Sequence, residues 1–115
     1  MTDCIFCRIS AGEIPAKEVY RSADAVAFHD VNPQAPTHVL VIPTRHLVNA
    51  AAADSDEGER LLGRLLRVAV QVAGKLGLTE GGFRLVLNNG KHGGQSVDHL
   101  HVHVLGGRRM AWPPG

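Results

Sequence analysis

The longest regular pattern in the chain is a stripe of apolar residues that returns every three or four positions. Its members are Leu61, Leu65, Ala69, Val72 and Leu76, flanked by Leu62, Leu66 and Ala73. A period near 3.6 with polar residues in between predicts an amphipathic helix whose stripe belongs to the core. Asp54 with Glu57 three positions later resembles a capping box, and Gly77 is a suitable residue to end the helix.

Short stretches of β-branched and aromatic residues lie on either side of this helix, separated by turn residues. They predict strands over residues 17–21, 25–29, 38–42, 83–87 and 97–105. Residues 5–9 could form one helical turn before Gly12 and Pro15. Several strands with short connections and a single long helix predict an α+β domain, in which the helix covers one face of an antiparallel sheet.

The last predicted strand carries histidine at every second position, as His99, His101 and His103. Successive side chains of a strand point to opposite faces, so the three imidazoles should share one face at a spacing of roughly 6–7 Å. That face should then be open to a ligand. Three explanations remain at this point: a chance cluster on a half-exposed strand, a metal site, or nucleophilic and acid–base chemistry on a phosphate.

The residues before the histidines favour the phosphate explanation. Gly90, Gly93 and Gly94 let the backbone approach a ligand closely and offer N–H groups to an anion. Ser96 adds a hydroxyl and Asn88 an amide on either side of this loop. Donors of this kind are the parts of an oxyanion site.

Length, charge and hydropathy narrow the class of protein and its partners. The 115 residues suffice for one domain, expected over residues 1–115. The formal net charge is +1, and no apolar run approaches the roughly 20 residues of a membrane helix, so neither nucleic acid nor a membrane is expected as a partner. The first residues lack the basic and apolar regions of a signal peptide, which favours a cytoplasmic location.

Cys4 and Cys7 form a C-x-x-C pair. In a cytosolic protein this spacing favours metal binding or redox chemistry over a structural disulfide. A thioredoxin-like motif would follow a strand, and no predicted strand precedes this pair. A pair of metal ligands and a pair of small, partly buried thiols therefore remain as alternatives.

With these motifs in order, the chain resembles the histidine triad (HIT) family, and within it the Hint-like branch. The family hallmark, histidine alternating with apolar residues, stands here as HLHVHVL over residues 99–105. Further matching stretches are residues 13–15, 27–30, 33–38, 41–43, 88, 93–96, 105–108 and the tail 112–115, WPPG. The resemblance spans essentially the whole chain. It implies a five-stranded antiparallel sheet with one long helix, forming a two-fold homodimer.

The resemblance also implies a nucleotidyl hydrolase that cleaves purine nucleoside phosphoramidates, including aminoacyl-adenylates, and releases AMP or GMP. His101 would attack the α-phosphate and form a covalent nucleotidyl-histidine, while His103 would contact the phosphate. Ser96 would assist the leaving group, and His38 and His99 would orient the catalytic ring. No cofactor is expected to be required for this catalysis.

Other positions match the nucleotide-binding residues of the family. Asp30 corresponds to a carboxylate that accepts from the ribose hydroxyls, although an Asx turn would also explain an aspartate at that strand end. Phosphate oxygens would be met by Asn88, Gly94 and Gln95. The base would be held by Ile5, Phe6, Phe28 and His29, of which Phe28 could equally be a core residue. Trp112 in the tail would reach toward the partner's active site.

Bacterial members that carry an N-terminal cysteine pair imply a structural zinc ion. The matching ligands are Cys4, Cys7, His46 and His99, a set of two thiolates and two imidazoles that suits a closed tetrahedral site. The chain departs from its relatives at Asp98, where an aromatic residue is frequent, and at Ala111, where some have histidine. The second departure leaves tail-dependent substrate preference open. His92 in the loop is interpreted as a solvated residue.

Two further functions stay open beside the phosphoramidase. A dinucleoside polyphosphate hydrolase of the Fhit-like branch is one, and the WPPG ending counts against it. A nucleotide-binding regulatory module with incidental catalysis is the other, and it would use the same residues. A purely structural zinc protein would leave Ser96, Asn88 and the glycine loop unexplained.

Overall fold

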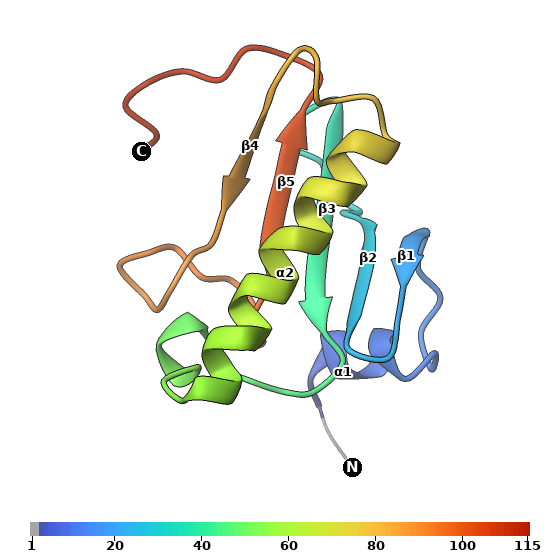
Figure 1. Ribbon diagram of the computed structural model, residues 1–115, viewed down its shortest axis with the longest axis vertical. Coiled ribbons are helices and arrows are strands. Elements are labelled where there is room, and N and C mark those ends of the chain that lie inside the picture. Colours follow the sequence, from blue (N-terminus) through green and yellow to red (C-terminus); the bar gives the residue numbers. More distant parts are fainter. Residues whose placement is uncertain (1–2) are drawn as a thin grey trace.

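Five antiparallel strands form one sheet in the order β1-β2-β3-β5-β4, so the last strand of the chain lies inside the sheet (Figure 1). The structure is a computed structural model that describes residues 3–115. Its elements are α1 (Ile5–Ser10), β1 (Glu18–Arg21), β2 (Ala25–His29), β3 (Thr37–Pro43), the 3-10 helix η1 (Ala50–Ala52), α2 (Asp56–Lys75), β4 (Phe83–Val86) and β5 (Val102–Gly106). The predicted α+β architecture with one long helix is thus confirmed.

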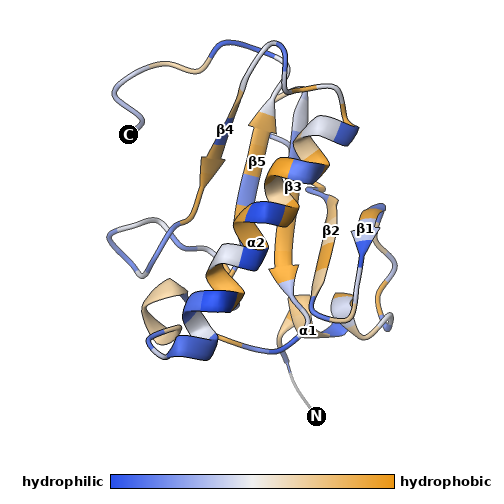
Figure 2. Cartoon of the chain, viewed as in Figure 1, coloured by the Kyte–Doolittle hydropathy of each residue, from blue (hydrophilic) through white to orange (hydrophobic). Residues whose placement is uncertain are grey.

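Helix α2 covers one face of the sheet with its apolar stripe (Figure 2). The fully buried residues of the stripe are Leu65, Val68, Ala69, Val72 and Ala73. They form one cluster with the inward-facing strand residues Ala25, Ala27, Val39, Val41, Val102 and Val104. None of the helices in the described part of the chain is long and apolar enough to cross a membrane.

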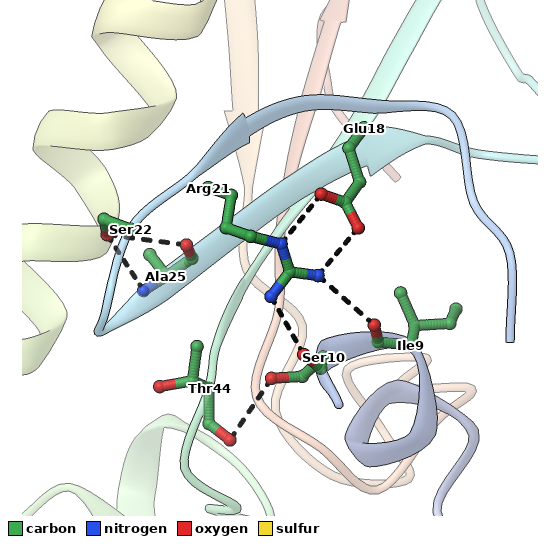
Figure 3. A network of polar contacts seen from close by, with 7 residues as sticks. All are labelled: Ile9, Ser10, Glu18, Arg21, Ser22, Ala25 and Thr44. Carbon is green, nitrogen blue, oxygen red and sulfur yellow. Dashed lines mark hydrogen bonds and ion pairs between the residues drawn. The ribbon is translucent and has the colours of Figure 1, made fainter. Parts of the chain in front are cut away.

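Helix α1 packs on the opposite face of the sheet through Phe6 and Ile9. The guanidinium of Arg21 fastens its end, donating to the carbonyls of Ser10 at 2.9 Å and of Ile9 at 3.5 Å (Figure 3). Two further bonds, at 2.9 and 2.7 Å, join Arg21 to the carboxylate of Glu18 in β1. The last carbonyls of a helix lack partners within the helix, so these bonds tie α1 to the first strand.

The cap predicted for α2 is off by one residue. The side chain of Ser55, not Asp54, accepts from the backbone N–H of Gly58 at 3.0 Å, and the helix starts at Asp56. A Cβ on Gly58 would lie 2.6 Å from the carbonyl carbon of Ala53, so the preceding chain crosses this first turn very closely. At the other end, Gly77 adopts φ +77° as expected of a residue just beyond a helix.

The last strand is shorter than predicted, because it begins at Val102 and not at residue 97. The ladder with β3 stops at the pair of Val41 and Val102, although β3 itself continues to Pro43, and residues 97–101 form no ladder pair. The N–H of Leu100 donates instead to the carbonyl of Leu47 at 2.7 Å. The prediction of a single domain over residues 1–115 stays a prediction, and residues 1–2 lie outside the described part.

Candidate functional site

A cavity of about 1270 Å³ opens on the sheet face that carries α1. Its wall combines α1, the end of β2, the loop that follows it, and the histidine segment. The lining residues predicted from the sequence are Ile5, Phe6, Phe28, His29, Asp30, His38, Ser96, His101 and His103. The structure thus gathers these residues, which are spread over most of the chain, around one cavity.

The expectation that the imidazoles share an open face is wrong for His99, which does not line the cavity, while His101 and His103 do line it. His99 is fully buried, and only 4% of His101 is exposed. The ring of Phe6 from α1 stands edge-on against both, with centroid distances of 5.8 Å to His99 and 5.2 Å to His101. The N-terminal helix therefore closes over the first part of the triad, and little of the surface of His101 remains open to the cavity.

The backbone fixes the protonation of His101. Its Nδ1 lies 2.7 Å from the carbonyl oxygen of His99. A carbonyl only accepts, so Nδ1 carries the proton and Nε2 of the neutral ring keeps its lone pair. A neutral ring held in this tautomer presents Nε2 as a nucleophilic nitrogen.

His103 is the second imidazole of the cavity, and its centroid lies 5.0 Å from that of His101. Its Nδ1 lies 2.8 Å from Nε2 of His38. Burial, with the neighbouring His101 and His38, lowers the pKa of His103 to about 4, so the ring is neutral at pH 7. The buried Nε2 of His103 has no hydrogen-bond partner within the described chain. Buried polar atoms are normally satisfied, so this nitrogen is suited to meet a ligand in the cavity.

Asp30 lies at the rim, directly after β2. One carboxylate oxygen accepts from the N–H of Asn32 at 2.9 Å, the Asx turn considered for this position. The other oxygen lies 3.4 Å from Nε2 of His38. The carboxylate thus both shapes the turn and faces the histidines.

The rest of the wall is apolar. Phe6 and Phe28 meet edge to face with centroids 5.7 Å apart, and Ile5 is 48% exposed beside them. Ile9, Ile14, Pro15 and Ala16 extend this surface. A slot of this composition would bury a flat hydrophobic ring and offer it few hydrogen bonds.

Four residues assigned from the resemblance do not line the cavity of their own chain: Asn88, Gly94, Gln95 and Trp112. The side chain of Gln95 instead braces the loop, accepting from the N–H of Gly90 and donating to the carbonyls of Val48 and Val97. Trp112 is 81% exposed and stacks with Arg84 of β4 at 6.0 Å. Asp98 and His92 are both exposed, away from the lining.

Sequence reasoning missed the contribution of the loop after β2. The backbone N–H of Gln34 donates to Nδ1 of His38 at 3.0 Å, and its carbonyl accepts from Arg108 at 2.9 Å. Both contacts use the backbone, which any residue type provides. The turn residues Asn32 and Pro33 signalled a loop, but nothing in the pattern signalled this donor.

A second cluster of possible ligand atoms lies where α1 meets His99, the first histidine of the triad. Nδ1 of His99 lies 3.3 Å from Sγ of Cys4, 3.5 Å from Sγ of Cys7 and 3.2 Å from Nδ1 of His46. Sγ of Cys7 lies 3.3 Å from Nδ1 of His46, and all four atoms fall within 4.8 Å of one another. Nε2 of His99 points to the carbonyl of Pro43 at 3.0 Å, so Nε2 carries the proton and Nδ1 its lone pair.

The donor atoms of this cluster fit a zinc ion. A tetrahedron with Zn–S bonds of about 2.3 Å and Zn–N bonds of about 2.0–2.1 Å has edges of about 3.3–3.8 Å. The separations between Cys4, Cys7, His46 and His99 correspond to these edges. Zinc sites commonly anchor a ligating imidazole through its second nitrogen, as the carbonyl of Pro43 does here.

Comparison with known proteins identifies the family of the chain. The family model of the HIT domain matches residues 11–110. An HIT-like protein of Synechocystis is 53% identical over 113 residues, which are 98% of this chain and 97% of that protein. The crystal structure of an HIT family hydrolase from Legionella pneumophila is 47% identical, with a TM-score of 0.94 over 98% of this chain and 100% of the other.

A solved structure from a eukaryote extends the comparison. The histidine triad nucleotide-binding protein of Candida albicans is 32% identical, with a TM-score of 0.81 over 96% of this chain and 83% of the other. The matched sequences and the shared fold agree. This chain is a member of the HIT domain family.

Proposed function

We propose that the protein is a nucleotidyl hydrolase that cleaves purine nucleoside phosphoramidates, and also the mixed anhydrides of aminoacyl-adenylates, through a covalent intermediate on His101. The observation that carries the proposal is the bond from Nδ1 of His101 to the carbonyl of His99, which leaves Nε2 as the nucleophile beside the unpartnered Nε2–H of His103. The similar proteins described as an HIT family hydrolase and as a nucleotide-binding protein support the same class.

In the first step, Nε2 of His101 attacks the α-phosphorus and the bond from phosphorus to the leaving nitrogen breaks. The Ser96 hydroxyl, on the cavity wall, passes a proton from solvent to that nitrogen, so the amine leaves neutral. The N–H of His103 donates to a phosphate oxygen, where negative charge develops. An aminoacyl-adenylate would lose its carboxylate in the same step without needing that proton.

In the second step, water attacks the same phosphorus from the side that the amine has left. The bond between phosphorus and Nε2 of His101 breaks, the nucleoside monophosphate leaves, and the water proton returns to solvent. Splitting one displacement into two lets a single neutral imidazole serve as nucleophile and then as leaving group. The carbonyl of His99 holds the ring in one orientation throughout.

The nucleoside would occupy the apolar part of the cavity. Phe6 and Phe28 offer the base an aromatic wall, and Asp30 at the rim offers a carboxylate to the ribose hydroxyls. A wall with few hydrogen-bonding groups favours large bases by contact area, which supports a preference for purines over pyrimidines.

Release of AMP from a fluorogenic adenosine phosphoramidate tests the proposal. The wild type should turn over, while His101→Ala should lose several orders of magnitude in kcat, and the exposed loop variant His92→Gln should retain the wild-type rate. Rapid denaturation in alkali, where a phosphorus–nitrogen bond to histidine persists, should trap nucleotide label on His101. A wild type that binds AMP but does not hydrolyse the substrate would favour the regulatory module, and faster cleavage of diadenosine polyphosphates would favour the Fhit-like activity.

We further propose that Cys4, Cys7, His46 and His99 hold a structural zinc ion. Zinc there would fasten α1 to the histidine segment, and the chemistry at His101 would proceed without it as a reactant. The protein should contain about one zinc per chain, lost in Cys7→Ser and kept in His92→Gln. Protein purified without added metal that contains no zinc and gains no thermal stability from it would contradict this proposal.

A two-fold homodimer is the proposed assembly. Strand β4 is an edge of the sheet, and Leu66 and Val70 of α2 are 42% and 48% exposed. An open edge beside exposed apolar side chains suits pairing of two copies, which would bring the tail with Trp112 toward the neighbouring subunit. Sedimentation equilibrium should give twice the chain mass. Val70→Glu should lower this mass, whereas Gln71→Glu, at an exposed position about 100° further around the helix, should not.

A further inference from the structure

The three side chains Asp30, His38 and His103 form a connected set at the cavity rim. All their ligand atoms lie within 4.8 Å of one another, and nothing in the two-step reaction above uses His38 directly. Its ring is 4% exposed, and burial lowers its pKa, so it is neutral at pH 7. The nitrogen that carries the single ring proton of His38 determines whether these three side chains form a hydrogen-bond relay or a metal site.

The backbone decides that position. The N–H of Gln34 donates to Nδ1 of His38 at 3.0 Å, so Nδ1 carries a lone pair and the proton sits on Nε2. A metal bound at Nε2 would need that proton on Nδ1, where the N–H of Gln34 already points. The set is therefore a hydrogen-bond relay and not a second metal site, in contrast to the cluster around His99.

The one Nε2–H of His38 faces two acceptors. Nδ1 of His103 lies at 2.8 Å and a carboxylate oxygen of Asp30 at 3.4 Å. The N–H of Asn32 holds the other oxygen of Asp30 at 2.9 Å, which fixes how the carboxylate faces His38. The charged, more distant acceptor competes with the neutral, closer one for the same proton.

We propose that Asp30 is a specificity-determining residue. Through His38, it couples the binding of the ribose to the strength of the hydrogen bond that His103 donates to the phosphate. This inference rests on the proposed function, in which ribose hydroxyls donate to Asp30. A hydroxyl on that carboxylate satisfies its charge and weakens its pull on the His38 proton. The proton then bonds fully to Nδ1 of His103. An imidazole that accepts more strongly at Nδ1 donates more strongly at Nε2, which faces the phosphate.

The ribose should consequently contribute to kcat and not only to KM. A substrate without the 2′- and 3′-hydroxyls loses its hydrogen bonds to Asp30, which raises KM. The Nε2–H of His38 then remains shared between Asp30 and Nδ1 of His103, which lowers kcat. One hydrogen bond weakened at the transition state corresponds to about a tenfold loss of kcat. A carboxylate that only binds ribose would move KM alone.

The kinetic test compares adenosine and 2′,3′-dideoxyadenosine phosphoramidates on the wild type and on His38→Gln. The wild type should lose about tenfold in kcat with the dideoxy substrate. The variant His38→Gln, whose side-chain amide has two protons for the two acceptors, should show equal kcat for both sugars. The exposed variant His92→Gln should behave as the wild type. A wild-type penalty confined to KM overturns the inference.

A spectroscopic test does not depend on turnover. In protein labelled with ¹⁵N-histidine, adenosine should move the proton shared by His38 and His103 downfield, and 2′,3′-dideoxyadenosine should not. Equal shifts with both nucleosides, or none with adenosine, overturn the inference. Absence of phosphoramidate hydrolysis alongside an adenosine-specific shift would reject the proposed reaction while leaving the coupling in place.

Discussion

Lowering the pH from 7 to 4.5 should destabilise the folded protein through His103. Burial lowers the pKa of this ring from its ordinary value of 6.5 to about 4. At a pH between these two pKa values, His103 is protonated in the unfolded chain and neutral in the folded chain. The unfolded state then holds more protons, so the free energy of unfolding falls as the pH falls through this window.

The size of the effect follows from the two pKa values. At pH 7 both states are mostly neutral at His103, and the cost is negligible. At pH 4.5 the unfolded ring is almost fully protonated and the folded ring is mostly neutral, which lowers the free energy of unfolding by about 2 kcal/mol. For a domain with a typical stability of about 5–15 kcal/mol, this is a measurable fraction.

Urea unfolding of the wild type and of His103→Gln at pH 7 and pH 4.5 measures this contribution. Glutamine can still accept the proton of His38 but does not titrate. The loss of stability between the two pH values should be about 2 kcal/mol smaller in His103→Gln than in the wild type. The exposed variant His92→Gln is the matched control. Equal losses in the wild type and His103→Gln would refute the reasoning, since His38, His99 and the carboxylates would then explain all of the pH dependence.

Two further predictions concern the helices. Gly58→Ala should destabilise the protein by about 1–3 kcal/mol, because the new Cβ would lie 2.6 Å from the carbonyl carbon of Ala53. Gly63→Ala, in the same helix but with no atom within 4 Å of the new Cβ, should stabilise the protein by about 0.5–1 kcal/mol. Equal shifts in the melting temperature of the two variants would contradict this. Arg21→Met should speed amide hydrogen exchange in α1 and weaken AMP binding, because the last carbonyls of α1 lose their donor. Arg67→Met on the exposed face of α2 should do neither, and unchanged exchange in α1 would show that its packing alone holds it.

Much of the fold could be predicted from periodicity. Each of the five strands and both α-helices appears where the apolar pattern placed it, with ends shifted by a few residues. The larger error, at residues 97–101, arose because alternation of His99 and His101 with aliphatic residues looks like a strand. Pairing depends on the partner strand, and the ladder with β3 stops at Val41 because Pro43, at the end of β3, has no N–H to donate.

The site was predictable to the extent that its chemistry resides in side chains. Imidazoles at alternate positions and a carboxylate after β2 could be picked out as candidates. The groups that set the protonation of these rings could not, because they are the carbonyl of His99 and the N–H of Gln34. Burial of the triad under α1 was equally hidden, since Phe6 contacts residues more than 90 positions away.

The contact between Cys4 and His99 joins positions 95 residues apart, and β5 enters the sheet between two strands made before it. A ribosome delivers the N-terminal helix and its packing partners on β2 and β3 first, while the histidines that Phe6 and Cys4 contact emerge almost last. The helix can dock early on the β2 and β3 residues, but its contacts with His99 close a long loop at an entropic cost and form only after the histidine segment is made. A nascent chain would therefore complete its cavity only near the end of translation, and incomplete chains would lack a functional nucleophile.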